Sequence, residues 1–141
     1  MTELTDDAGF LLSRASGLVA RATNAALAEH GLRVRHYSVL VLACGAAEGM
    51  SQRDLACRLG LDPSQVVQLV DELADAGLVE RRPSATDRRT KLVAGTPLGQ
   101  RVRRQAARRA TRGQQRPLGC LNEEEQATLR ALLSRVVDSA G

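Results

Sequence analysis

The sequence predicts a mainly α-helical fold of the α+β class, in which one β-hairpin interrupts a series of helices. Leu, Val and Ala recur at helical spacing through most of the 141 residues. Aromatic residues are nearly absent, with one Phe, one Tyr and no Trp, so the core is built from aliphatic side chains. Only residues 78–94 contain two short strand-like runs around a turn. Together these observations favour packed helices over an all-β fold.

Two helices are expected in the first 50 residues. The first is predicted over about 6–29 and is followed by Gly31 as a stop. The second is predicted over about 35–47, and Gly49 ends that segment. The apolar side chains that recur along one side of these segments are Phe10, Leu11, Leu18, Ala22, Tyr37, Leu40 and Val41.

Two short helices with a tight turn between them are expected next. Ser51, with Asp54 three residues later, is typical of a helix start, and Gly60 ends that helix. The following helix starts at residues 62–65, where Asp caps, Pro occupies the first helical position and Gln65 can reach back to the cap. This arrangement is typical of a helix-turn-helix.

Two further helices are predicted after the hairpin. Residues Thr96 and Pro97 start a long helix, which we expect to end near residue 115 because Pro117 and Gly119 follow. Asn122, with a Glu three residues later, starts the last helix. The last helix carries an apolar stripe formed by Leu129, Leu132, Leu133, Val136 and Val137.

The length corresponds to one domain, residues 1–141, built from two regions. Residues 32–96 form a winged-helix lobe that can close a small core of its own. The flanking helices, in 1–31 and 97–141, are expected to lie outside that core because they are distant in sequence. Little of the chain is left to cover the last helix, so we expect 1–31 and 97–141 to form a dimerisation region in a homodimer.

The helix over about 63–75 is the candidate DNA-reading element. In a helix-turn-helix the second helix enters the major groove, and its first exposed residues meet base edges. Here these residues are Ser64, Gln65 and Gln68, and Gln can bond adenine through its amide. Arg53 on the preceding helix is a further candidate for DNA contact. The alternative is that Gln65 only caps the helix and that Gln68 is solvated.

The hairpin is the candidate wing, with strands at residues 78–82 and 90–94. Its basic residues are expected to contact DNA, and the arginines at the tip suit a narrow minor groove. Asp87 beside them is expected to orient an arginine through a bidentate pair. Alternatively, the run is only a solvated turn. The candidate DNA-contacting residues of the hairpin are Arg82, Arg88, Arg89 and Lys91.

Composition excludes several other classes of protein. The cysteines, Cys44, Cys57 and Cys120, form no CxxC pair, so we expect reduced thiols, no metal site and no cofactor. There is no Ser/His/Asp set, phosphate-binding glycine loop or evident carboxylate pair, so we expect no enzyme. The acidic start lacks the pattern of a signal peptide, and no run of 18 apolar residues spans a membrane. We therefore expect a cytoplasmic location.

Residues 32–99 resemble the MarR (multiple antibiotic resistance regulator) family of winged-helix transcription factors. The segment of sequence that carries the resemblance is MSQRDLACRLGLDPSQVVQLVDELADAGLVERRPSATDRRTKLV. The family's wing has an Asp-x-Arg pattern followed by a basic residue, which falls here on Asp87, Arg89 and Lys91. The resemblance implies that Arg89 enters the minor groove with Asp87 as its anchor. It also implies a dimer held by the first and last helices, which binds a palindromic operator on double-stranded DNA as a repressor.

Two features depart from the family pattern. The family commonly ends its second wing strand with Leu-Thr, whereas Gly95 and Thr96 stand here before Pro97, and we expect a looser junction. The long helix that follows is unusually basic. Its arginines are either a solvated face or a contact for DNA flanks or for the partner's acidic termini, and they are Arg101, Arg104, Arg108, Arg112 and Arg116.

The resemblance further implies a small, often anionic aromatic effector in a cleft beside the dimer helices. Candidate residues for this cleft are Arg14, His36, Tyr37 and Arg101, each of which can instead be structural or solvated. A thiol-sensing branch places its Cys early in the first helix, where this chain has none, although an oxidation-sensitive Cys57 stays open. The alternatives to a DNA-binding regulator are a winged-helix module for protein contacts and a small-molecule or redox sensor without specific DNA binding.

Overall fold

The structure is a computed structural model that describes residues 3–141, and it confirms the mainly helical α+β class. The described part of the chain consists of helical elements and one small antiparallel sheet. In chain order the elements are α1 (Ala8–Leu27), η1 (Ala28–His30, a 3₁₀ turn), α2 (Val34–Gly45), β1 (Met50–Ser51), α3 (Gln52–Leu59), α4 (Pro63–Asp75), β2 (Val79–Pro83), β3 (Lys91–Gly95), α5 (Pro97–Leu118) and α6 (Glu123–Ala140).

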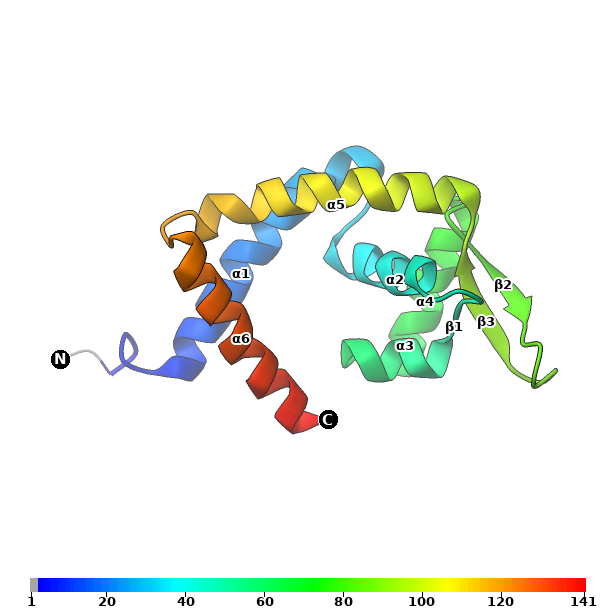
Figure 1. Ribbon diagram of the computed structural model, residues 1–141, viewed down its shortest axis with the longest axis horizontal. Helices are drawn as coiled ribbons and strands as arrows, with labels where there is room; N and C mark the ends of the chain where they lie inside the picture. The colour runs from blue at the N-terminus through cyan, green and yellow to red at the C-terminus, as the bar shows by residue number, and fades with distance from the viewer. Residues whose placement is uncertain (1–2) are drawn as a thin grey trace.

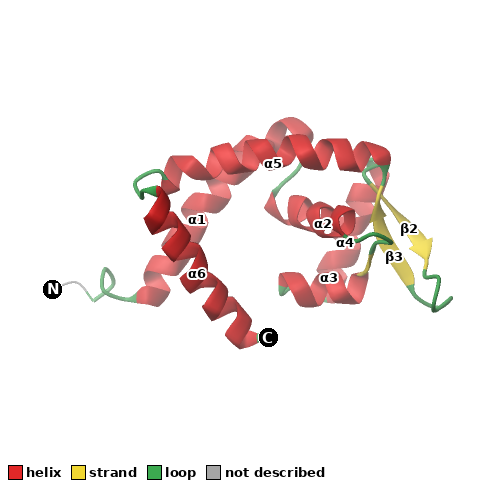
Figure 2. Ribbon diagram, viewed as in Figure 1, coloured by secondary structure: helices red, strands yellow, loops and turns green. Residues whose placement is uncertain are grey.

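The elements form an arch with α5 as its top (Figure 1). One arm of the arch contains α1, which packs along α5, and α6, which turns back from the far end of α5. The other arm is a lobe of α2, α3, α4 and the sheet. Figure 2 shows that the strands lie at the outer edge of this lobe and extend beyond the helices. The long α5 therefore fixes the distance between the two arms.

The predicted helix starts of the helix-turn-helix are confirmed. The backbone N–H of Asp54 donates to Ser51 Oγ at 3.1 Å at the start of α3. The backbone N–H of Asp62 donates to Gln65 Oε1 at 3.1 Å at the start of α4. Each contact satisfies a backbone donor that a helix start leaves unpaired. The turn between α3 and α4 is thus held by its own side chains.

The end of α5 lies beyond the predicted position. The helix continues through Pro117 to Leu118, because a proline in the last turn removes only its own N–H bond. The backbone N–H of Gly119 then donates to the carbonyl of Gln115 at 2.7 Å and closes the helix. The last helix starts as expected, since the backbone N–H of Glu125 donates to Asn122 Oδ1 at 2.8 Å.

The sheet has three strands, whereas the sequence indicated two. β2 and β3 pair antiparallel as expected, each displaced by one residue from its predicted bounds. The additional strand β1 pairs with the other edge of β3, with Met50 opposite Val93 and Ser51 opposite Leu92. A strand of two residues has no periodicity to detect. It ties the start of α3 directly to the wing.

Helices α1 and α5 contribute side chains to the core. This differs from the expectation that the flanking helices lie outside it. Leu27 at the end of α1 is fully buried in the same cluster as Leu40 of α2 and Leu73 of α4. Ala106 and Ala110 of α5 belong to the same cluster. Distance in sequence is no barrier here, because α5 runs back over the lobe. α6, in contrast, contributes no buried residue.

The junction between β3 and α5 is tight rather than loose. Thr96 Oγ1 donates to the carbonyl of Gly77 at 2.6 Å and accepts the backbone N–H of Gly99 at 3.0 Å. A Cβ on Gly99 would lie 1.9 Å from the carbonyl oxygen of Leu78. The glycine therefore lets the start of α5 lie directly on the backbone before β2. This contact seats the start of α5 against the residue that precedes β2.

Candidate nucleic-acid interface

Helix α4 presents a polar face to solvent because its apolar face is fully occupied. Val66, Val70 and Leu73 are buried in the core, so the opposite side of the helix is fixed outward. Ser64 and Gln68, two predicted base-reading residues, are exposed on the first half of this helix. An exposed, rigidly seated helix start can lie in a major groove.

The two glutamines of α4 differ in exposure and in their hydrogen-bond partners. Gln65 is half-buried, and its Oε1 accepts the backbone N–H of Asp62 in the helix cap. Gln68 is exposed, and its amide donates to Glu72 Oε1 at 3.4 Å. Gln68 is therefore the better placed of the two to offer its amide to a base. The alternative in which Gln65 acts mainly as a cap agrees with its geometry.

The tip of the wing is organised by Asp87, although not through an arginine side chain. Its carboxylate accepts the backbone N–H of Arg89 at 3.0 Å and the hydroxyl of Thr90 at 3.1 Å. The expected bidentate pair with a guanidinium does not form, because the closest donors belong to the two residues that complete the turn. The side chains of Arg88 and Arg89 are exposed and are in no ion pair within the described chain. An ordered turn thus presents two uncompensated cations.

Arg81 holds the wing against the helix-turn-helix. Its Nη2 donates to Asp71 Oδ1 at 2.7 Å, and its Nε and Nη2 donate to Gln52 Oε1 at 3.0 and 2.8 Å. One guanidinium on β2 therefore joins α3 and α4. Arg81 is not among the hairpin residues that the sequence indicated for DNA contact. The signal that identifies its role is the pairing of three elements, which appears only in the fold.

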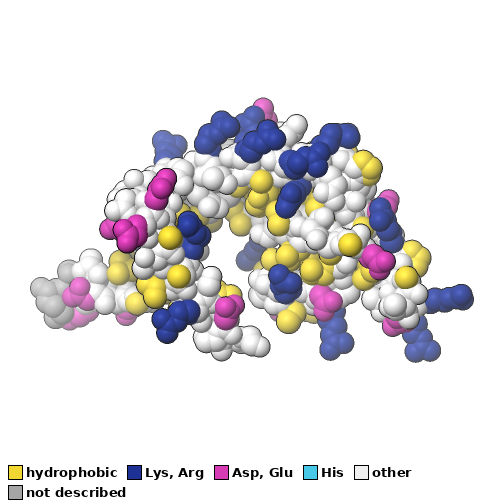
Figure 3. Space-filling model, viewed as in Figure 1, with side chains coloured by type: hydrophobic (Ala, Val, Ile, Leu, Met, Phe, Trp, Pro, Cys, Tyr) yellow, Lys and Arg dark blue, Asp and Glu magenta, His cyan; other side chains and the backbone are white. Residues whose placement is uncertain are grey.

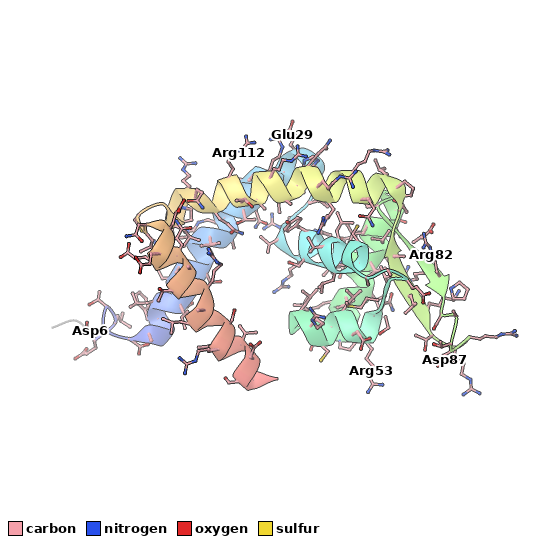
Figure 4. All side chains as sticks on the ribbon, viewed as in Figure 1. Asp6, Glu29, Arg53, Arg82, Asp87 and Arg112 are labelled. Atoms are coloured by element: carbon pink, nitrogen blue, oxygen red, sulfur yellow. The ribbon has the colours of Figure 1, made fainter. Side chains whose placement is uncertain are left out.

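Basic side chains gather along one edge of the lobe. Figure 4 shows Arg53 directed away from α3 on the same lower side as the wing tip around Asp87. Arg82 lies on the outer side of the sheet, and its Nε donates to Glu80 at 2.6 Å. Lys91 at the start of β3 is exposed. Together with the tip arginines, these residues form an edge that suits the phosphate backbone on either side of a groove.

Several basic side chains of α5 lie on a different side of the molecule. Figure 3 shows Lys and Arg side chains along the top of the arch over α5. Arg112 and Glu29 lie there, far from Arg53 and the wing tip (Figure 4). Arg109 forms an ion pair with Glu29 at 2.5 Å. A duplex held by the wing and α4 would lie below the arch, so this arrangement does not favour the DNA-flank alternative.

A pocket of about 470 Å³ lies between α1, α2 and the middle of α4. Its volume falls in the range of about 300–1,000 Å³ that is usual for small-molecule sites. Of the four predicted effector residues, His36 lines this pocket, whereas Arg14, Tyr37 and Arg101 do not. Cationic, polar and apolar groups share the lining, which consists of Ser16, Ala20, Asn24, Arg33, Val34, Arg35, His36 and Leu69.

The other three predicted effector residues have different surroundings. Arg14 on α1 and Arg101 on α5 are exposed, and Tyr37 packs against the core. Arg33 and Arg35 were missed, although the basic run from residue 33 to 36 was a visible signal. Asn24 was also missed, and it fixes this corner of the pocket because its Oδ1 accepts the backbone N–H of Val34 at 2.8 Å.

His36 connects the pocket to helix α4. Its Nε2 is hydrogen-bonded to Glu72 Oε2, and this bond lowers the pKa of the Glu72 carboxyl below its ordinary value. Its Nδ1 is buried and has no hydrogen-bond partner within the described chain. His36 therefore lines the pocket and is also bonded to helix α4.

Apolar side chains remain exposed on the arm of α1 and α6. Leu132, Val136 and Val137 of α6 are 51%, 58% and 69% exposed, and no residue of α6 is buried. Phe10, Leu11, Leu12 and Leu18 of α1 are also exposed. Figure 3 shows hydrophobic side chains gathered on this arm. Exposed apolar side chains gathered on one arm are typical of an interaction site.

The thiols lie in three different environments. Cys44 is half-buried, and burial raises the pKa of its thiol although Arg103 and Arg104 oppose the shift. Cys57 and Cys120 are exposed. Within the described residues, no group of three His, Cys, Asp or Glu side chains could hold a metal ion. None of the described helices is long and apolar enough to cross a membrane.

Comparison with known proteins places these features in a family. A sequence model of the MarR family matches residues 30–90. A transcriptional regulator of the MarR family from Rhodococcus sp. RHA1 is 47% identical in sequence and superposes with a TM-score of 0.91, covering 96% of both chains. CouR from Rhodococcus jostii RHA1, bound to p-coumaroyl-CoA, is 48% identical with a TM-score of 0.88, covering 96% of this chain and 95% of CouR.

Two further similarities concern regulation of transcription. A transcriptional repressor, CouR, bound to a 23-mer DNA duplex, is 29% identical with a TM-score of 0.87 and covers 97% of this chain and 96% of that one. A protein of Thauera aromatica, named for regulation of the hcr operon, is 34% identical over 88 residues. This match spans 62% of the chain and about half, 53%, of the Thauera protein.

Proposed function

This chain belongs to the MarR family, and from that premise we propose that it is a dimeric, ligand-responsive repressor that binds a palindromic operator. The observation that carries the proposal is the combined surface of α4 and the wing. It presents an exposed amide at Gln68 and exposed cations without an ion pair in the described chain at Arg88 and Arg89. The DNA-bound CouR structure, 29% identical over nearly the whole chain, supports the same use of the fold.

DNA recognition is divided between two elements. Ser64, Gln65 and Gln68 at the start of α4 face the major groove, with Gln68 as the principal base-reading side chain. The wing places Arg89 in the adjacent minor groove, where a narrow groove attracts a guanidinium. Asp87 keeps that tip in one conformation through the backbone of Arg89. The remaining proposed DNA-contacting side chains bind phosphates, and they are Arg53, Arg82, Arg88 and Lys91.

The regulator acts as a homodimer. Within the described part of the chain, α6 has no buried residue and its apolar side chains stay exposed, and exposed apolar side chains of α1 lie on the same arm. A second copy supplies an identical surface, which a two-fold axis brings face to face. Residues 1–31 and 97–141 thus form the dimerisation region around the lobe of residues 32–96. The dimer sets two recognition helices about one helical turn of DNA, ~10 bp, apart.

The effector site is the pocket between α1, α2 and α4. Its basic side chains, Arg33, Arg35 and His36, suit a ligand with anionic or strongly accepting groups, and its apolar lining suits an aromatic ring. CouR, with 48% identity to this chain, is the protein bound to p-coumaroyl-CoA. An aromatic acid or its thioester is therefore the proposed effector class. Binding of the effector lowers the affinity of the regulator for DNA. The regulator works in the cytoplasm and carries out no enzymatic reaction.

Fluorescence anisotropy with labelled duplexes tests the proposal directly. The dimer should bind the region upstream of its own gene more tightly than a shuffled duplex, with an affinity that falls steeply as salt rises. p-Coumaroyl-CoA should release the specific duplex. Equal binding to both duplexes at moderate salt would leave a winged helix for protein contacts or a sensor without specific DNA binding as the better explanation.

A further inference from the structure

The effector pocket and the base-reading face of α4 share a chain of hydrogen-bonded side chains. His36 of α2 lines the pocket and bonds through Nε2 to Glu72 on α4. The other carboxylate oxygen of Glu72 accepts the amide of Gln68 at 3.4 Å. The path from His36 in the pocket to the proposed base-reading amide is therefore two hydrogen bonds long. The orientation of the Gln68 amide can therefore change without a movement of the backbone.

A single hydrogen bond holds the His36 side chain within the described residues, so the link from His36 through Glu72 to Gln68 is easily broken. Nδ1 of the ring is buried and unpartnered, so Glu72 is the sole hydrogen-bond partner that holds the imidazole within the described chain. The His36 side chain is 17% exposed, whereas Glu72 is 49% exposed. A ligand atom in the pocket can therefore reach the ring, while Glu72 loses little by turning to water.

The surrounding charges favour capture of His36 by a ligand. Arg33 and Arg35 line the same pocket and form no ion pair in the described chain. They attract an anionic ligand to the pocket that His36 lines. Asp71, the neighbouring acid on α4, is already paired with Arg81 and does not compete for His36.

We propose that Glu72 is the positioning residue for Gln68, that His36 holds Glu72 in place, and that an effector breaks this hold by taking the hydrogen bond of His36. In the free protein, Glu72 fixes the Gln68 amide in one orientation for base readout. When a ligand accepts the Nε2–H of His36, Glu72 is released and Gln68 becomes mobile. The inference rests on the proposed repressor function and adds the route by which the ligand reaches the DNA-reading side chain.

A double-mutant cycle tests the link between His36, Glu72 and Gln68 by measuring the ligand's effect on DNA affinity. For each protein, the Kd for the specific duplex is measured with and without saturating p-coumaroyl-CoA, and the ratio of the two is the coupling. Calorimetry first establishes the concentration that saturates each variant. We expect a ratio of about 5–150 in the parent, the usual range for such couplings. His36→Phe and Glu72→Gln should each reduce it at least fivefold, and the double variant should reduce it no further.

Asp75→Asn is the matched control, because it removes one exposed acid from the end of the same helix without touching the chain of contacts. Its coupling should equal that of the parent. Reductions by His36→Phe and Glu72→Gln that multiply in the double variant would overturn the inference, since they would show two independent routes. An unchanged coupling in Glu72→Gln would overturn it as well. In either case specific DNA binding by the parent leaves the repressor function standing.

A second readout needs no DNA. The pKa of the Glu72 carboxyl, followed by carbon NMR, should rise toward its ordinary value when p-coumaroyl-CoA is bound, because the bond to His36 is the main cause of the lowered pKa. An unchanged Glu72 titration in the saturated complex would overturn the inference, as would absence of p-coumaroyl-CoA binding. If the duplex is not bound specifically but the Glu72 titration shifts, the repressor function fails and the link through His36 holds.

Discussion

Removal of Arg81 and of Arg88 should affect different properties of the protein, because Arg81 holds the wing against the helix-turn-helix and Arg88 is in no ion pair within the described chain. Arg81→Ala deletes three hydrogen bonds to Gln52 and Asp71, all at the surface. Since exposed charged contacts contribute little each, we expect a total loss of about 1–2 kcal/mol in the free energy of unfolding. For a chain of 141 residues this corresponds to a fall in Tm of about 3–7 °C. Arg88→Ala should leave Tm unchanged.

The effect on DNA separates the two arginines further. Arg88 is expected to neutralise a phosphate, so its removal should lower the slope of log K against log salt by about 1. Arg81→Ala should weaken binding by loosening the wing while leaving that slope unchanged, because its guanidinium is already neutralised by Asp71. Calorimetric melting and anisotropy at several salt concentrations measure both quantities. A reduced slope in Arg81→Ala with an unchanged Tm would refute the clamp.

Further changes probe the wing tip, the dimer, the Glu72 carboxyl and the buried thiol. Asp87→Ala removes the hydrogen-bond acceptors that order the tip of the wing, so it should weaken DNA binding although it also removes a negative charge. Tighter DNA binding, measured by anisotropy, would contradict this role of Asp87. Val136→Glu places a charge on the exposed face of α6 and should yield a monomer in analytical ultracentrifugation, whereas an unchanged dimer would place the interface elsewhere. The lowered pKa of Glu72 means that its contribution to stability is full above the ordinary pKa of Glu, about 4.3, and is lost as pH falls through the lower folded value. The stability difference between Glu72→Gln and the parent, from denaturant unfolding, should therefore shrink in acid below that range; a constant difference would oppose this. Cys44 should react with a thiol reagent more slowly than the two exposed cysteines, because burial raises the pKa of its thiol, and equal rates would contradict that burial.

Much of the helical framework could be predicted from the sequence because local signals determine it. Ser51 and Asn122 begin helices through contacts that span only three residues. The glycine after each short helix is equally local. The end of α5 was harder, because Pro117 is a helix breaker by propensity and yet costs little in a last turn.

Contacts between distant segments could not be predicted. Strand β1 is two residues long and exists only because β3 lies beside it. Likewise, Arg81 looks like any other basic residue of the wing until the fold brings Gln52 and Asp71 to it. The pocket shows the same limitation: His36 was expected to line it, but Asn24 and Arg33 come into the lining only once α1 and α2 are packed.

The central claim is that α4 and the wing of a dimer read a specific DNA sequence. Selection of bound duplexes from a random pool, by the parent protein and by Gln68→Ala, tests it most directly. We expect the parent to enrich a two-fold symmetric sequence with half-sites ~10 bp apart. The Gln68→Ala variant should lose preference at one position in each half-site, equivalent to ~1–3 kcal/mol. No enrichment by the parent, or an identical sequence from both proteins, would contradict the account.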